Sequence, residues 1–404
     1  MSTTALWLTA LLLPGGDATL HWKDKDYGFD ALPPELPPAA HAAVEAWMGW
    51  AKTADYRMDL DPSARVLLVT RAANGHIEKQ MELVAGVLER FDRELAAPAQ
   101  RREVPPPASA LEPKKPEKPA KAGDHPPLPE DPEDPEGGDH PWKIKPTQTT
   151  PIAPEPVTVT RWGALDVPFD TETMVLLVLR NPDDFEVVLK SLGKAFPHLV
   201  DWSKEAKALQ GFVLPAPLVG AYLETHPSLE EWDPDHELVS RLARLSLLRR
   251  FGELPNWFAL GYAWHLEIAL QGAVYCFPWR DEFVWATEHT AWPHSIEQRY
   301  ERERVKPNDF LAFVRGKYVD DMARASWAMV EYLVAKETAK LPDLLDELRV
   351  YREEHGRIMD DARTWHRDVD YEIPAAEQQT LMLKHLGPYL DRATFWLRKE
   401  LVPE

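Results

Sequence analysis

The sequence contains one cysteine, Cys276, among 404 residues. A single cysteine cannot form an intrachain disulfide or a metal site built from several cysteines, and its apolar surroundings (AVYCFPW) predict a buried hydrophobic residue. Basic residues are also scarce, because 46 lysines and arginines face 66 aspartates and glutamates and leave a net charge of −20. This acidic balance, without a basic stripe that includes aromatic residues, argues against binding to nucleic acids or anionic membranes.

Several enzyme motifs are missing as well. The chain has no Gly-x-x-x-x-Gly-Lys or Gly-x-Gly-x-x-Gly loop, so nucleotide binding has no support. Ser240 lacks the Gly-x-Ser-x-Gly surroundings of a nucleophilic serine, and we interpret it as part of a helix surface. No apolar stretch is long enough to cross a bilayer, so no integral membrane segment is expected.

Residues 1–18 have some features of a secretory signal peptide. The apolar run Ala5–Leu13 precedes Pro-Gly-Gly and a small-residue site that ends at Ala18, although no lysine or arginine precedes the run. We therefore expect an exported protein, periplasmic or extracellular. The alternative is an ordinary apolar N-terminal segment on a cytoplasmic protein.

The chain divides by composition into a part before residue 98 and a part after residue 156. Residues 19–97 contain a predicted helix, a short apolar strand and an amphipathic helix (Ala39–Lys52, Arg65–Thr70 and His76–Leu95). Residues 98–156 hold 17 prolines and few large apolar side chains, which predicts a disordered linker or insertion. In residues 157–404 the pattern predicts a strand, a helix beginning near Asn181, and later helices (Thr173–Arg180, then Asn308–Lys336, Leu341–Arg357 and Ala375–Leu401).

The stretch Glu237–Glu267 reads as a helical hairpin, ELVSRLARLSLLRRFGELPNWFALGYAWHLE. Its leucines recur at helical spacing, Gly252 marks the end of a first helix, and Pro255 marks the start of a second. This sequence resembles the active-site hairpin of the peptidase MA-like (gluzincin) metallopeptidases. The matching positions are Gly252, Leu254-Pro255, Trp257 and Gly261. In that family the first helix carries His-Glu-x-x-His and the second carries a glutamate. The two histidines and the later glutamate bind zinc, and the first glutamate activates water.

In this chain other residues occupy the positions of the three zinc ligands and of the water-activating glutamate. Anchored on Gly252 and Trp257, the resemblance places His-Glu-x-x-His on Ser240 to Arg244, with Arg241 at the water-activating position, and places the zinc-binding glutamate on Leu260. A second register begins at His236-Glu237 but puts Ser240 at the second histidine. Neither register supplies three zinc ligands, and arginines repel a cation, so we expect a non-catalytic site without a cofactor.

Other histidines are weaker metal candidates. The nearest to the hairpin in sequence are His236, His265, His289 and His294, with Glu267 and Glu288 as carboxylate partners. None shows a spacing that fixes two ligands on one helix face, so structural histidines are the preferred interpretation.

The first helix also carries an arginine on the face that would hold the metal. Ser240 and Arg244 share this face, and Leu260, Trp264 and Glu267 share the facing side of the second helix. A buried guanidinium needs a carboxylate, so an Arg244–Glu267 pair is predicted to join the helices. The alternative is that Arg244 binds an anionic ligand.

Together these features predict an α+β protein, with a small mixed sheet followed by a mainly helical C-terminal part. The resemblance implies a zincin-like region over residues 157–404, which the first strand and helix (65–95) would complete, with the proline-rich segment as an insertion. It also implies a degenerate peptidase that binds or scaffolds an unidentified protein or peptide. An active hydrolase with non-standard ligands, zinc included, is the alternative.

Overall fold

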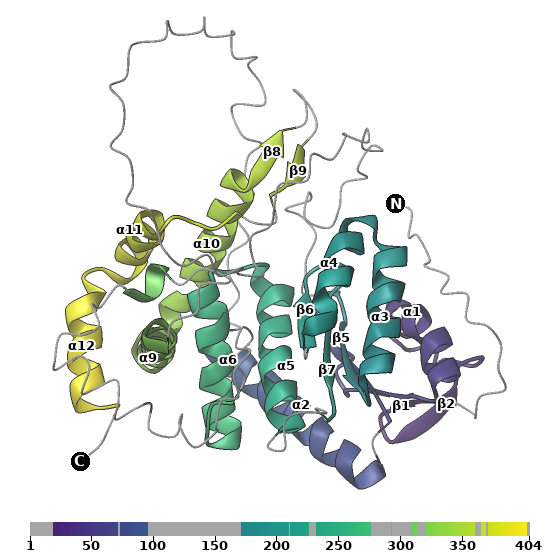
Figure 1. Cartoon of the computed structure of the whole chain (residues 1–404). Helices are drawn as coiled ribbons and strands as arrows, with labels where there is room; N and C mark the ends of the chain where they lie inside the picture. Colours follow the sequence, from purple (N-terminus) through teal and green to yellow (C-terminus); the bar gives the residue numbers. More distant parts are fainter. Residues whose placement is uncertain are drawn as a thin grey trace, which may run out of the picture.

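The computed structural model describes residues 19–71, 73–95, 171–209, 211–225, 232–275, 292, 309–312, 320–359, 365–368 and 371–401. It is a mixed α/β structure in which a central sheet has helices on both faces and further helices stack beyond one of them (Figure 1). The predicted signal peptide and the proline-rich segment 98–156 lie outside the described residues.

The larger sheet has seven strands in the order β2-β1-β3-β4-β5-β7-β6. The strands are β1 (Thr19–Trp22), β2 (Lys25–Gly28), β3 (Arg57–Leu60), β4 (Val66–Thr70), β5 (Met174–Leu179), β6 (Gly211–Leu214) and β7 (Val219–Leu223). Three neighbouring pairs are parallel, namely β1–β3, β4–β5 and β5–β7, and the other three are antiparallel. The α+β class is confirmed, but the sheet is larger than the small one predicted.

Strands β4 and β5 lie in the middle of the sheet. Both are continuous apolar runs, as expected for strands that are covered on both faces. Alternate residues enter different cores, so that Val66 and Leu68 face one core while Leu67 and Val69 face the other. Since β4 precedes residue 98 and β5 follows residue 156, the two parts of the chain share one sheet, with the proline-rich stretch between them in sequence.

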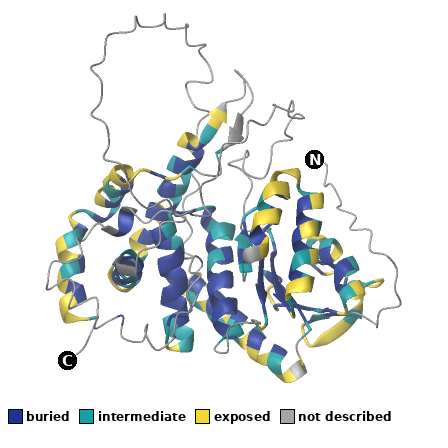
Figure 2. Ribbon diagram, viewed as in Figure 1, coloured by how far each residue is buried: buried dark blue, intermediate teal, exposed yellow. Residues whose placement is uncertain are grey.

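Each face of the sheet is covered by its own helices (Figure 1). On one face lie α1 (Pro38–Ala54) and α3 (Pro182–Ala195), followed by the short α4 (Val200–Glu205) between 3-10 turns at Pro197–Leu199 and Ala206–Ala208. On the other face lie α2 (Asn74–Leu95) and α5 (Pro234–Phe251). Figure 2 shows that the buried residues gather along the sheet and on α5 and α6 (Asn256–Gln271), whereas the outer helices are exposed on one side.

The C-terminal part stacks helices outward from α5. Helix α6 packs between α5 and α9 (Asp320–Lys336). Three further helices follow, α10 (Leu341–His355), α11 (Ala375–Leu386) and α12 (Tyr389–Lys399); α10 contacts α5, α12 contacts α9, and α11 contacts both α10 and α12. A glycine allows the close approach of α6 to α9. A Cβ at Gly261 would lie 2.9 Å from the carbonyl oxygen of Ser326 and 2.9 Å from Val330 Cγ2.

The sequence predictions need several corrections. The predicted helix over Ala375–Leu401 is two helices, because Gly387 (φ 68°) and Pro388 interrupt it. The helix predicted to reach Arg357 ends at His355, and Arg357–Met359 is strand β8, paired with β9 (Trp365–Arg367). Of the predicted helix Asn308–Lys336, the described parts are a 3-10 turn (Asp309–Ala312) and α9; a second such turn, Thr338–Lys340, precedes α10.

Within the described residues, no helix is both long enough and apolar enough to cross a membrane.

Candidate functional site

The α5–α6 hairpin forms for local reasons that the sequence contains. Asp233 caps α5, since its side chain accepts a hydrogen bond from the backbone N–H of Asp235 at 2.9 Å, and Pro234 occupies the first turn. Helix α5 ends at Gly252 (φ 70°), and α6 follows Pro255 and ends at Gly272 (φ 80°). Only glycine adopts such positive φ angles without strain.

The first two turns of α5 bury polar side chains that helices usually expose. Asp235, His236, Glu237, Ser240 and Arg241 are each at most 6% exposed. Charged groups removed from water are costly unless they are paired. The partners of these residues therefore define the site.

His236 joins α5 to α6 through Glu267. Its Nδ1 lies 3.2 Å from Glu267 Oε2, and the same oxygen accepts a hydrogen bond from the backbone N–H of Tyr275 at 2.8 Å. Glu267 is fully buried. Burial disfavours the charged imidazole, but the hydrogen bond and negative charge of Glu267 outweigh it and raise the pKa of His236 above its ordinary value.

Glu237 is paired within α5. Arg241 Nη2 lies 2.7 Å from Glu237 Oε2, one helical turn away. The guanidinium also lies against strand β6, because a Cβ on Gly211 would be 3.0 Å from Arg241 Nη2. Beside this pair, Lys79 of α2 forms an ion pair with Asp235. The start of α5 is thus held to its neighbours by alternating positive and negative charges.

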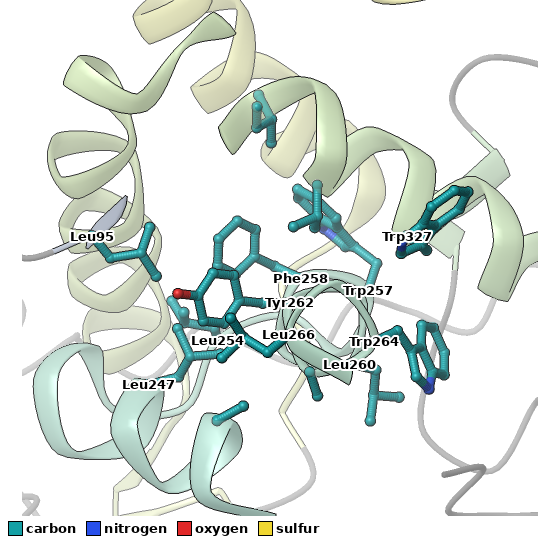
Figure 3. Close-up of a cluster of buried hydrophobic side chains, with 14 of the residues drawn as sticks. Leu95, Leu247, Leu254, Trp257, Phe258, Leu260, Tyr262, Trp264, Leu266 and Trp327 are labelled. Carbon is teal, nitrogen blue, oxygen red and sulfur yellow. The ribbon is translucent and has the colours of Figure 1, made fainter. Parts of the chain in front are cut away.

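The other predicted site residues lie along the same two helices. Ser240 is buried, so its interpretation as part of a helix surface was wrong; Leu260 is buried too, and Arg244 is half-buried. Trp264 packs edge-on against Trp292, with ring centroids 5.5 Å apart. Figure 3 shows Trp264 on the side of α6 that faces Trp327, while Tyr262 and Phe258 project on the opposite side, toward Leu95.

Glu267 and His265 each contact a charged partner on another helix. Glu267 binds His236, and the predicted Arg244–Glu267 pair stays a prediction. His265 lies between two carboxylates, with Nδ1 2.8 Å from Glu331 Oε1 and Nε2 3.2 Å from Glu94 Oε2. His289 and His294, and the carboxylate candidate Glu288, lie outside the described residues.

The His236–Glu267 contact was missed by sequence reasoning, although a signal for it exists. His236 lies 16 residues before Gly252 and Glu267 lies 15 residues after it. Two antiparallel helices that meet near Gly252 therefore place these residues side by side. The sequence pairs His236 with Glu267 only as candidate metal ligands, and the family resemblance points to Leu260 instead.

The donor set does not fit a zinc ion. Over the described ranges, no group of three or more histidine, cysteine, aspartate or glutamate side chains is arranged to hold a metal. At the start of α5 the guanidinium of Arg241 lies beside Glu237, where its positive charge would repel a cation.

Comparison with family models and with curated proteins gives no match for this chain.

Proposed function

We propose that this chain is a catalytically inactive, gluzincin-like protein that acts in binding or scaffolding outside the cytoplasm. The family resemblance of the hairpin sequence supports the zincin-like assignment, and its degenerate positions support the loss of catalysis. The partner is an unidentified protein or peptide. Export rests on the apolar run before Ala18.

The Glu237–Arg241 ion pair is the observation that carries this proposal. In the register anchored on Gly252, Arg241 itself stands at the water-activating position. In the register that begins at His236, Glu237 stands there, and Arg241 binds its carboxylate at 2.7 Å. The arginine occupies the carboxylate oxygen that would accept a proton from water. Both registers therefore place a positive charge where the reaction needs a free carboxylate.

Zinc content and peptidase activity of the purified full chain test the proposal together. We expect no stoichiometric zinc by elemental mass spectrometry after dialysis against a zinc-containing buffer. We also expect no cleavage of unfolded casein above the level of a buffer blank. One equivalent of bound zinc, or casein cleavage that copurifies with the chain, would overturn the proposal.

One observation favours the alternative, an active hydrolase with non-standard residues. His236 of α5 contacts Glu267 of α6, and the negative charges of Glu267 and Glu237 help to raise the pKa of His236, a residue type that often acts as a general acid or base. In that case Glu237→Gln abolishes hydrolysis while circular dichroism shows that the variant remains folded. Glu89→Gln is the matched control, because Glu89 is an exposed helical glutamate on α2. Equal activities in the two variants would exclude Glu237 as the base.

A further inference from the structure

A buried histidine outside the α5 cluster joins three helices through charge. His265 of α6 is 6% exposed and has a carboxylate at each ring nitrogen, Glu331 of α9 at 2.8 Å and Glu94 of α2 at 3.2 Å. Neither carboxylate belongs to the hairpin. The contact therefore connects the sheet-covering helix α2, across α6, to the outer helix α9.

Counting donors and acceptors decides where the proton lies. A neutral imidazole donates from one nitrogen only, whereas an ionised carboxylate can only accept. Both carboxylates already accept other hydrogen bonds, Glu94 from Tyr262 Oη at 3.1 Å and Glu331 from Trp327 Nε1 at 2.9 Å. These donors stabilise the ionised carboxylates, so both short contacts are satisfied only if the imidazole carries a proton on each nitrogen.

We infer that His265 is an imidazolium that acts as a protonation-dependent latch between α2, α6 and α9. With the proton in place, one positive charge is shared by two carboxylates from different helices. Without it, one of the two carboxylates faces a nitrogen lone pair in a buried site. That arrangement is repulsive, so loss of the proton releases either the end of α2 or the middle of α9 from α6.

The surrounding charges support the closed latch at neutral pH. On α2, Arg90 and Arg93 bind the other oxygen of Glu94 at 3.4 and 3.3 Å, so they favour its ionised form. On α6, Glu267 faces away to His236 of α5. Burial opposes the charge on His265, but Glu331 and Glu94 outweigh it and raise the pKa of His265 to about 9.

Histidine NMR on the full chain tests the inference directly. In a sample labelled with nitrogen-15 in its histidines, the His265 signals are those lost in His265→Gln. At pH 7.5 we expect both ring nitrogens of His265 to be protonated, with titration only at alkaline pH. A neutral ring at pH 7.5 would overturn the inference. If His265→Gln does not fold, Glu331→Gln identifies the His265 signals instead. This variant is expected to lower the pKa of His265, so its signals are those whose titration shifts.

Hydrogen exchange at fixed pH tests the latch as a device. Glu331→Gln removes one negative partner and should speed amide exchange at least tenfold in the last turn of α2 or in α9 near Trp327, while α1 stays unchanged. Glu347→Gln is the control, because Glu347 also binds a histidine, His385, but joins α10 to α11 and contacts neither α2 nor α6 through it. Exchange that is unchanged in α2 and α9, or equally fast across the whole fold, would contradict a local latch.

Discussion

Arg241 and Glu237 form a buried ion pair on one helix, with Nη2 and Oε2 2.7 Å apart. Both side chains are about 5% exposed. Such a pair stabilises little relative to apolar residues, but losing one partner removes the opposite charge that offsets the burial of the other. The pair also touches β6 at Gly211. It therefore holds the edge of the sheet against α5.

We predict a strong coupling between these two residues. Arg241→Met alone should lower the free energy of unfolding by about 3–5 kcal/mol, because Glu237 is left in a buried site. Adding Glu237→Leu should recover much of that loss. A double-mutant cycle by urea denaturation measures the coupling. The exposed pair Lys204–Asp201 is the control, and its removal should change stability very little. Additive effects at positions 237 and 241 would contradict the prediction.

Glu267 allows a comparison of two candidate partners on α5. The structure shows its contact with His236, and the helix-face argument predicts a second coupling with Arg244. Two double-mutant cycles share Glu267→Leu and combine it with His236→Leu or Arg244→Met. We expect coupling in both cycles, each on the order of 1–3 kcal/mol for hydrogen-bonded charges in contact. If only the His236 cycle couples, Arg244 has no part in joining the helices.

Stability should fall as the pH rises from neutral into the alkaline range. The pKa of His265 is about 9 in the folded chain, against an ordinary value of 6.5. A group with a raised folded pKa contributes its full stability below the ordinary value and loses it as the pH rises through the folded value. The loss due to His265 therefore spans pH 6.5 to about 9. Denaturation of wild type and His265→Gln across this window checks the sign, because the difference between them should shrink with pH.

Two glycines in helices should respond in opposite directions to alanine. A Cβ at Gly261 meets the backbone of α9 at 2.9 Å, whereas a Cβ at Gly75 meets nothing within 4 Å. Gly261→Ala should cost about 1–3 kcal/mol through overpacking. Gly75→Ala should stabilise by a few tenths to about 1 kcal/mol, because alanine loses less entropy in a helix. Thermal melts of both variants check the pair, and a neutral Gly261→Ala would show that α6 and α9 separate easily.

The sequence predicts best the elements whose signal is local. The runs at Val66–Thr70 and Met174–Leu179 are continuous and apolar, and both are strands. Strand β1 was missed because its alternation covers only four residues, and β2 because it is short and carries charged residues. Other charged contacts depend on residues distant in sequence, such as Glu94 and His265 outside the α5 cluster, which are 171 positions apart. No spacing rule connects them before the fold does.

Rebuilding the family ligand set tests the resemblance itself. The variant carries Ser240→His, Arg241→Glu, Arg244→His and Leu260→Glu, the four changes that the register on Gly252 and Trp257 requires. Ser240 and Leu260 are buried, so without metal the new polar groups should destabilise the fold.

Zinc should restore the stability of this variant, because it binds only the folded form. At a thousandfold excess over Kd the gain is about 4 kcal/mol. We expect about one equivalent of zinc, with ligand distances of roughly 2.0–2.2 Å by X-ray absorption. The three-residue variant that keeps Leu260 is the control and should bind more weakly. A folded four-residue variant that takes up no zinc would show that this register, and with it the assignment of the hairpin, is wrong.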